Sequence, residues 1–263
     1  MTSLWTAGIR RVADRAALVH EAVDLIEKVV VDAIQRRGRC SIALGGGGTP
    51  RPVYVALAER HAGGRSPIDW ARVFVLFGDE RCVPPEDDLS NFRMATESLL
   101  SRVPIPAEQV LRMRGEMDPH LAATEYEIAI GRLLRSTERP VVDLVILGLG
   151  EDGHTASLFP GTAAVRERGR VCVPQYVDKL SAWRLTLTPG VIGSARTAVF
   201  LVEGASKATS LARVLEGPFM PDVLPAQLFA STDPVHKSGE STEPRVVWIV
   251  DQAAAGGLRR PAP

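Results

Sequence analysis

An excess of charge of either sign is absent from this sequence. Lys and Arg together number 31, Asp and Glu also number 31, and the formal net charge is zero. Proteins that bind nucleic acids or membrane surfaces usually carry a basic excess, so neither partner is expected here. An anionic ligand would have to be held by local geometry instead. Lysine is scarce within the basic set, with only four residues, which adds interest to any lysine near a strand end.

Long apolar runs and patterned cysteines are also missing. No stretch approaches the roughly 18 apolar residues of a membrane span, and the first residues, MTSLWTAGIRRVAD, lack the apolar run of a signal peptide. The three cysteines, Cys40, Cys82 and Cys172, form no CxxC pair and no zinc pattern. We therefore expect reduced thiols, no membrane partner and a cytoplasmic location.

The sequence does contain a regular alternation of apolar and amphipathic segments. Its 263 residues are 45% hydrophobic, which allows a large core, and we expect a single domain over residues 1–263 with a mobile tail from about residue 252. Apolar runs predict strands at residues 40–44, 72–77, 141–150, 184–189, 197–204 and 245–250. Helical spacing predicts helices at residues 14–37, 49–60, 92–103, 121–135 and 206–215. This alternation indicates an α/β fold, with a parallel sheet covered by helices on both faces.

Polar segments follow four of the predicted strands, and ligands of parallel sheets bind outside the carboxyl ends of the strands. The first segment is GGGGTP at residues 45–50. Its glycines let the backbone approach an anion, and the helix that follows offers unpaired N–H groups, with Thr49 as a candidate N-cap and Pro50 as the first helical residue. The loop lacks the Gly-Lys-Ser/Thr ending of a nucleotide-binding loop and the GxGxxG order of a dinucleotide site. It fits one phosphate better than a nucleotide; the alternative is a tight strand–helix turn.

The second segment, GDERCVPPEDDLSN at residues 78–91, places Asp79, Glu80 and Arg81 directly after a strand. The planar guanidinium of Arg81 is suited to clamping a phosphate, and Asp79 to orienting a sugar hydroxyl or a water molecule. The alternative is a solvated acidic loop with a surface salt bridge. In a further segment, EGASKA at residues 203–208, Lys207 lies near a helix start at the same edge of the sheet, although a surface lysine is the simpler interpretation.

The segment GLGEDGHTASLFPG, residues 148–161, follows the strongest strand signal and contains His154. A histidine can accept a proton near neutral pH, as a general base must, and Asp152 is placed to orient its ring or to help position water. A lone histidine in a turn is more often structural, so this role depends on what lies around it.

Taken together, the segments resemble the 6-phosphogluconolactonase family. The similar stretches are LGGGGTPRPVY, FGDERCVPPEDDLSNFRMA, VDLVILGLGEDGHTASLFPGT, WRLTLTP and VEGASKA, in the family's order from about residue 40 to residue 210. The stretches DERCVPP with the later SN, and DGHTASLFPG, are the specific ones. One departure is Glu151, where a proline or a small residue is expected.

The resemblance implies a Rossmann-like parallel sheet, related to that of sugar-phosphate isomerases and deaminases, and hydrolysis of 6-phospho-D-glucono-1,5-lactone in the oxidative pentose phosphate pathway without metal or cofactor. His154 would be the general base that activates water. The implied substrate-binding positions, which include the phosphate contacts, are Gly46, Gly47, Gly48, Thr49, Asp79, Arg81, Asn91, Arg184 and Lys207. Backbone N–H groups of residues 148–153 would stabilise the oxyanion. The partner is then a small sugar phosphate, and the protein a monomer or small homo-oligomer.

Two other functions stay open at this point. A glucosamine-6-phosphate deaminase or sugar-phosphate isomerase needs a carboxylate base, and the related deaminases carry a Glu five residues after the corresponding histidine, where this chain has Phe159. A non-catalytic sugar-phosphate sensor would normally carry a DNA-binding segment, and no basic helix-turn-helix pattern is present. Because one fold can host all three functions, the site has to decide between them.

Overall fold

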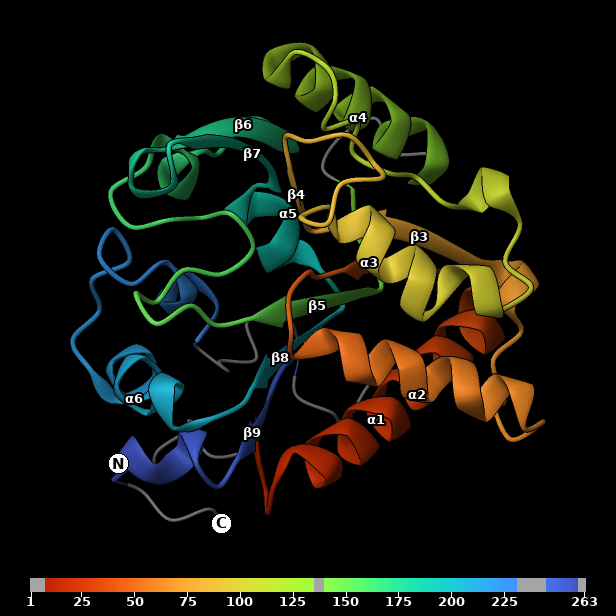
Figure 1. Ribbon diagram of the computed structural model, residues 1–263, viewed down its shortest axis with the longest axis horizontal. Coiled ribbons are helices and arrows are strands. Elements are labelled where there is room, and N and C mark those ends of the chain that lie inside the picture. Colours follow the sequence, from red (N-terminus) through yellow and green to blue (C-terminus); the bar gives the residue numbers. More distant parts are fainter. Residues whose placement is uncertain (1–7, 135–139, 231–244, 260–263) are drawn as a thin grey trace.

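Six parallel strands form the central sheet of this protein, which a computed structural model describes over residues 8–134, 140–230 and 245–259 (Figure 1). The strand order is β1-β9-β8-β5-β2-β3. The bounds are β1 (Ile9–Val12), β2 (Cys40–Leu44), β3 (Val73–Phe77), β5 (Leu144–Gly148), β8 (Thr197–Val202) and β9 (Val246–Asp251). The predicted α/β fold with a parallel sheet is confirmed, although β1 was not predicted.

In the described part of the chain, six α-helices accompany the strands and flank the sheet (Figure 1). They are α1 (Arg15–Arg37), α2 (Pro50–Ala62), α3 (Asn91–Ser98), α4 (Pro119–Leu134), α5 (Pro189–Ser194) and α6 (Ala208–Glu216). Helix α1 begins where Asp14 accepts a hydrogen bond from the amide of Ala17 and ends at Gly38, whose φ of 74° is the left-handed conformation that glycine adopts easily. Helix α2 starts at Pro50 with Thr49 at the N-cap position, as predicted, although the side chain of Thr49 makes no capping hydrogen bond.

The predicted strand at residues 184–189 belongs to a second, antiparallel sheet instead of the parallel one. This three-stranded sheet has the order β4-β7-β6, with β4 (Asp79–Arg81), β6 (Cys172–Val177) and β7 (Ala182–Leu187). Helix α4 packs on it, and Glu127 of α4 accepts hydrogen bonds from the Arg170 side chain and the Val171 amide just before β6 (Figure 1). A single residue, Gly78, links β3 to β4, so the small sheet begins at the carboxyl edge of the large one.

The core lies between the strands and their helices and is strongly apolar. Strand β9 is buried over its whole length, and Trp248 stacks on Phe200 of β8 with 3.8 Å between ring centroids. Burying a large apolar side chain of this kind contributes about 1.5–3 kcal/mol, so the rigidity of the sheet comes mainly from these central strands. The carboxyl ends of β2, β3, β5 and β8 consequently hold their loops in fixed relative positions.

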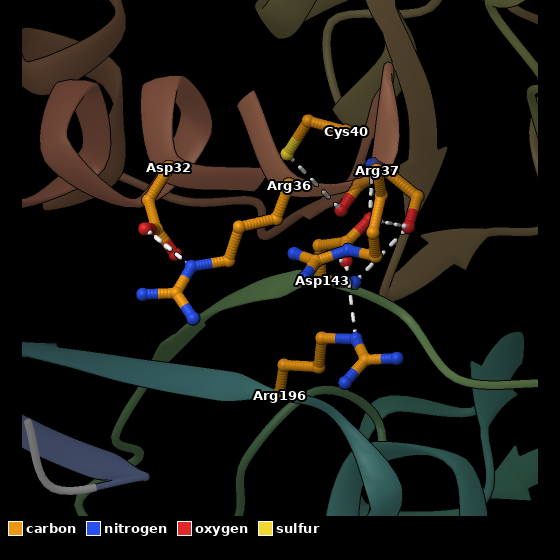
Figure 2. A network of polar contacts seen from close by, with 7 residues as sticks. Asp32, Arg36, Arg37, Cys40, Asp143 and Arg196 are labelled. Atoms are coloured by element: carbon orange, nitrogen blue, oxygen red, sulfur yellow. Dashed lines mark hydrogen bonds and ion pairs between the residues drawn. The ribbon is translucent and has the colours of Figure 1, made fainter. Parts of the chain in front are cut away.

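The amino ends of β2 and β5 are joined by a polar network around Asp143 (Figure 2). One carboxylate oxygen of Asp143 accepts hydrogen bonds from the amide and the hydroxyl of Ser41, each at 2.8 Å. The other oxygen pairs with Arg37 at 2.9 Å and with Arg196 at 3.4 Å. Asp143 is buried, so these partners stabilise a charge that would otherwise be costly to bury. The network lies at the edge of the sheet opposite the polar loops.

The last described residues pack on the body of the protein. Residues 254–257 form a short 3₁₀-helix, η8 (Ala254–Gly257), against α6, and Ala254 and Ala255 are buried. Residues 252–259 of the expected tail are thus part of the folded structure, while residues 260–263 lie outside the described ones. The cysteines are unpaired, with Cys40 and Cys172 buried. Within the described residues, no helix has both the length and the apolar character that a membrane span requires.

Candidate active site

A cleft of about 240 Å³ opens at the carboxyl edge of the parallel sheet. Its walls come from the loops after β2, β3, β5 and β8, which are separated by up to about 160 residues of sequence. Of the residues expected at the site, nine line this cleft, namely Gly46, Gly47, Gly48, Thr49, Asp79, Arg81, Asn91, His154 and Lys207. Asp152 and Arg184 are not among the lining residues, and each lies behind a residue that is.

The glycine loop follows β2 and packs against two neighbouring segments. A Cβ atom on Gly46 would lie 1.8 Å from Oδ1 of Asn91, and one on Gly45 would lie 2.6 Å from the carbonyl oxygen of Ile146 on β5. Gly47 has a φ of 101°, a conformation that strains any residue with a side chain. These contacts require glycine at three successive positions and bring the loop backbone to the floor of the cleft. Exposed amides here and the start of α2 can receive an anion.

Glu80 organises the loop after β3 from below, although it was not expected to be a site residue. It is buried and accepts hydrogen bonds from the amides of Arg81, Asn91 and Phe92 at 2.7–2.8 Å and from the Ser90 hydroxyl at 3.2 Å. Burial raises the pKa of Glu80, and the backbone hydrogen bonds oppose that rise. This carboxylate closes the loop of residues 81–90 and fixes the start of α3.

Asp79 and Asn91 lie next to each other under the cleft. The side-chain amide of Asn91 donates to the backbone oxygen of Asp79 at 2.9 Å and to its carboxylate at 3.3 Å. The other carboxylate oxygen of Asp79 accepts a 2.7 Å hydrogen bond from Ser157, which lies in the loop after β5. Asp79 therefore ties two cleft loops together, a contact that spans 78 residues of sequence.

Two arginines are neighbours on adjacent strands of the small sheet. Arg81 on β4 is directly paired with Arg184 on β7, and Arg81 also donates a 2.5 Å hydrogen bond to the carbonyl oxygen of Leu89. Burial and the charge of Arg81 lower the pKa of Arg184. Two adjacent cations favour binding of an anion between or beside them, and Arg81 is the one that reaches the cleft.

His154 and Asp152 form a close pair at the end of β5. The carboxylate oxygen Oδ1 of Asp152 lies 2.5 Å from Nδ1 of His154 and also accepts the His154 amide at 3.1 Å. A carboxylate facing Nδ1 favours a proton on that nitrogen, which leaves the lone pair on Nε2. His154 lines the cleft with its side chain 29% exposed, and among the described residues Nε2 has no hydrogen-bond partner. The ring is thus oriented by Asp152 and open to the cleft.

The turn that carries this pair is tight. The amide of Gly150 donates to the His154 carbonyl oxygen, and the amide of Gly153 donates to the Gly150 carbonyl oxygen. A Cβ on Gly150 would lie 2.0 Å from Nδ1 of His154, so only glycine allows the ring to stand there. The amides of Gly150 and Gly153 are already engaged and are not free for an oxyanion, which removes two of the donors expected from residues 148–153. The amide of His154, just after that segment, is engaged by Asp152.

Two lysines approach this turn from other elements. Lys207, after β8, lies in the cleft with Nζ 3.7 Å from the Glu151 carboxylate. Lys179, in the turn between β6 and β7, contacts the second carboxylate oxygen of Asp152. Partial burial acts to raise the pKa of Asp152, but the hydrogen bonds from His154 and Lys179 outweigh it and hold this pKa well below its usual range. Lys179 was not singled out from the sequence; the scarcity of lysine was the available signal.

No three His, Cys, Asp or Glu side chains of residues 8–134, 140–230 and 245–259 gather into a metal-binding cluster. Phe159, five residues after His154, stacks on the imidazole with 4.2 Å between ring centroids. An aromatic ring thus occupies the place where the related deaminases carry a carboxylate.

Known proteins are similar to this chain over most of its length. A family model described as glucosamine-6-phosphate isomerases/6-phosphogluconolactonase matches residues 13–238. The 6-phosphogluconolactonase of Nostoc sp. is 36% identical over 248 residues, 93% of this chain and 95% of that protein. The human 6-phosphogluconolactonase is 34% identical over 230 residues, 86% of this chain and 83% of that one.

Solved structures agree with these matches. A 6-phosphogluconolactonase from Trypanosoma cruzi superposes with a TM-score of 0.81 at 27% identity, covering 98% of this chain and 99% of the other. A monomeric glucosamine-6-phosphate deaminase has a TM-score of 0.76 at 20% identity, covering 95% of this chain and 99% of that one, a likeness of fold alone. The shared fold therefore does not separate the two activities, and the residues around His154 have to.

Proposed function

Because this chain belongs to the family of glucosamine-6-phosphate isomerases and 6-phosphogluconolactonases, we propose that it hydrolyses 6-phospho-D-glucono-1,5-lactone to 6-phospho-D-gluconate. The observation that carries the proposal is the pair of His154 and Asp152, in which Nδ1 of the imidazole lies 2.5 Å from Oδ1 of the carboxylate. The other imidazole nitrogen, Nε2, is open to a cleft that also contains Arg81 and Lys207. Lactone hydrolysis needs a base near a carbonyl carbon and an anchor for a remote phosphate, and this cleft offers both.

In this mechanism Nε2 of His154 removes a proton from a water molecule as the water oxygen attacks the lactone carbonyl carbon. The tetrahedral intermediate then collapses, the bond from C1 to the ring oxygen breaks, and His154 returns the proton to that oxygen. Asp152 holds the ring and stabilises the imidazolium that forms between the two steps. Acid–base assistance of this kind contributes about 10²–10⁴-fold in rate.

The phosphate of the substrate is placed by Arg81, Lys207 and the amides and hydroxyl of residues 46–49, with Arg184 adding positive charge behind Arg81. Asp79 and Asn91 support the floor of the cleft through their mutual hydrogen bonds. Binding energy from this remote group then orients the carbonyl carbon toward His154. The lactone without phosphate should accordingly be a poor substrate.

A deaminase or isomerase is the second candidate on this fold. Such reactions need a carboxylate base, and Phe159 stacks on His154 at the position where the related deaminases have one. We therefore rank lactone hydrolysis first. We also propose that the activity is cytoplasmic and the enzyme a monomer or small homo-oligomer that acts without nucleic acid, in keeping with its zero net charge and its widely spaced cysteines.

The deciding experiment measures proton release in weak buffer after freshly generated 6-phosphoglucono-1,5-lactone is added. Wild type should accelerate release well above the uncatalysed rate, His154→Ala should fall close to that rate, and the matched control His61→Ala, at the end of α2, should match wild type. Circular dichroism checks that each variant is folded. A folded His154→Ala with near-normal turnover would refute the base, and no acceleration by wild type would refute the lactonase.

A further inference from the structure

The turn between β6 and β7 reaches the active-site loop from the small sheet. It contains the 3₁₀-turn η5 (Asp178–Leu180), and Ser181 follows with a φ of 46°, a left-handed conformation that reverses the chain. Lys179 at this turn extends to Asp152, which is 27 residues earlier in the sequence. An exposed hairpin thus delivers a cation to the residue that orients the proposed base.

The carboxylate of Asp152 is shared between two partners, one on each oxygen. Oδ1 faces Nδ1 and the amide of His154, whereas Oδ2 contacts Nζ of Lys179. With both oxygens engaged, the carboxylate plane cannot rotate away from the imidazole without losing the lysine. Lys179 is not a cleft-lining residue, so its path to the reaction passes through Asp152.

Phe159 provides a second contact for the same lysine. Its ring stacks on the His154 imidazole, and Nζ of Lys179 lies 4.8 Å from the ring centroid, within range of a cation–π interaction. Lys179 therefore contacts both of the side chains that restrain His154, the carboxylate at its Nδ1 edge and the aromatic ring on its face.

From these contacts we propose that Lys179 is a positioning residue for His154, which locks Asp152 and Phe159 around the imidazole and tunes its basicity. The proposal rests on the proposed role of His154 as general base. Lys179 neutralises part of the Asp152 charge, so it reduces the stabilisation that Asp152 gives to the imidazolium. The hairpin then sets the balance between a strongly oriented base and one that still releases its proton to the leaving oxygen.

Other charges near His154 do not replace this contact. Glu151 precedes Asp152 and pairs with Lys207 of the segment after the neighbouring strand β8, and Asp79 and Arg81 line the cleft from the segment after β3. Asp178 adjoins Lys179 in the hairpin turn. Among the charged groups of the described residues named here, Asp152 is the one that makes a polar contact with the imidazole, and it is also the group that Lys179 holds.

The test compares the pH dependence of kcat/KM for wild type, Lys179→Met, Lys179→Arg and Leu180→Ala. In Lys179→Met the lysine charge is missing, so Asp152 stabilises the imidazolium more. The acidic limb of the kcat/KM profile should therefore move to higher pH by roughly half a unit to one unit, with KM nearly unchanged. Lys179→Arg should restore the wild-type limb. Leu180→Ala, which shortens an exposed neighbour in the same turn, should leave the limb in place.

The Asp152→Asn variant serves as a background that shows whether Lys179 affects His154 through Asp152 or by its own charge directly. In that background Lys179→Met should produce little further displacement of the limb. An equal displacement in both backgrounds, an unmoved limb in Lys179→Met, or a change confined to KM would each overturn the positioning role, the last because it would place Lys179 against the substrate.

A second measurement follows the His154 ring directly, by its carbon-bound proton in NMR spectra, with His154→Ala used to assign the signal. The midpoint of the ring titration should rise in Lys179→Met relative to wild type, and an unchanged midpoint would overturn the proposal. This measurement does not depend on turnover. If His154 is not the base, His154→Ala keeps its activity. The NMR comparison still decides in that case whether Lys179 acts on the imidazole ring.

Discussion

Asn91 lies directly beneath Gly46, where a single added carbon at the glycine would sit 1.8 Å from the amide oxygen of Asn91. Asn91 is buried and is itself held by Asp79 and by Glu80, so it has nowhere to retreat. The glycine loop and the loop after β3 are therefore built against each other. The absence of a side chain at Gly46 is a packing requirement of the cleft.

Gly46→Ala should consequently disturb the cleft far more than its size suggests. The new methyl group must displace Asn91 or the glycine loop, and either movement shifts the groups proposed to bind phosphate. We expect KM to rise at least about tenfold and stability to fall by about 1–3 kcal/mol, as for other overpacked sites. Steady-state kinetics and urea unfolding measure both effects. Gly48→Ala is the control for stability, because nothing lies within 4 Å of a Cβ there; equal losses of stability in the two variants would contradict this explanation.

Asp152→Asn removes the charge that orients His154. The amide cannot accept from both partners as the carboxylate does, so the imidazole loses its preferred tautomer, and kcat should fall by roughly 10- to 100-fold with the fold retained. The variant also makes a prediction about stability. The pKa of Asp152 is depressed in the folded protein, so its contribution is present above its ordinary value of 3.8 and is lost as the pH falls below that value.

Urea unfolding at several pH values tests the stability part. Wild type should be more stable than Asp152→Asn near pH 7, and the difference should shrink as the pH is lowered below about 4. A difference that stayed constant over this range would mean that the charge of Asp152 does not stabilise the fold.

Much of the sheet could be predicted from local patterns. Strand β2 was predicted at residues 40–44 and occurs there, because its five residues are all buried and flanked by an arginine and a glycine run. Helix α1 was predictable from its periodicity and from Gly38. Strand β1 was not, because IRRV has only two apolar residues and is stabilised by its pairing with β9, which is more than 230 residues away. The antiparallel direction of β7 likewise depends on β4 and β6.

The candidate site shows the same division. Strand-end segments could be gathered into one region because parallel strands share an edge, and nine of the expected residues do line one cleft. The supporting contacts could not be found this way. Ser157 meets Asp79 across 78 residues, and Lys179 meets Asp152 through a hairpin that no local pattern joins to the loop. Glu80 resembled its charged neighbours in the sequence, and its role becomes visible only in the four hydrogen bonds that it accepts within the folded loop.

Because Glu151 pairs with Lys207, we expect it to compete with the substrate for this proposed phosphate-binding lysine. The two side chains lie 3.7 Å apart, but Glu151 is 66% exposed and Lys207 only 25%, so the carboxylate can swing into solvent when a phosphate arrives. Glu151→Gln should therefore lower KM by up to about fivefold, as expected for a partly screened ion pair, with kcat nearly unchanged. Lys207→Met should raise KM by at least tenfold. Steady-state kinetics at low and high salt provide the check, and a KM that rises in Glu151→Gln would show that Glu151 helps to bind substrate.

Glu80→Gln should destabilise the loop after β3. Gln has one acceptor oxygen for the four donors that Glu80 satisfies, and its own NH₂ group would face backbone amides, so a loss of about 1–3 kcal/mol is expected. The pKa of Glu80 is raised in the folded state, so its titration favours folding below its ordinary value of 4.5 and this contribution is lost as the pH rises through the folded value. The stability difference between wild type and Glu80→Gln should therefore be larger near pH 4.5 than at pH 7.

Urea unfolding of Glu97→Gln provides the matched control for Glu80→Gln. Glu97 is an exposed carboxylate of α3 that pairs with Arg93, so its replacement should leave stability nearly unchanged. Equal effects at positions 80 and 97 would mean that the buried hydrogen bonds of Glu80 contribute nothing specific.

Asp143→Asn should separate stability from activity, because Asp143 lies at the amino ends of β2 and β5, away from the cleft (Figure 2). The variant breaks ion pairs with Arg37 and Arg196 and weakens the hydrogen bonds from Ser41. Removing one partner of a fully buried pair costs about 3–5 kcal/mol; since both arginines are partly exposed, we expect roughly 2–3 kcal/mol. At temperatures below its unfolding transition, Asp143→Asn should have the same kcat and KM as wild type. Asp32→Asn, which breaks the exposed pair with Arg36, should cost less than about 1 kcal/mol. If Asp143→Asn lowered kcat at a temperature where it is fully folded, the amino edge of the sheet would be coupled to the catalytic loop, contrary to the separation that the structure indicates.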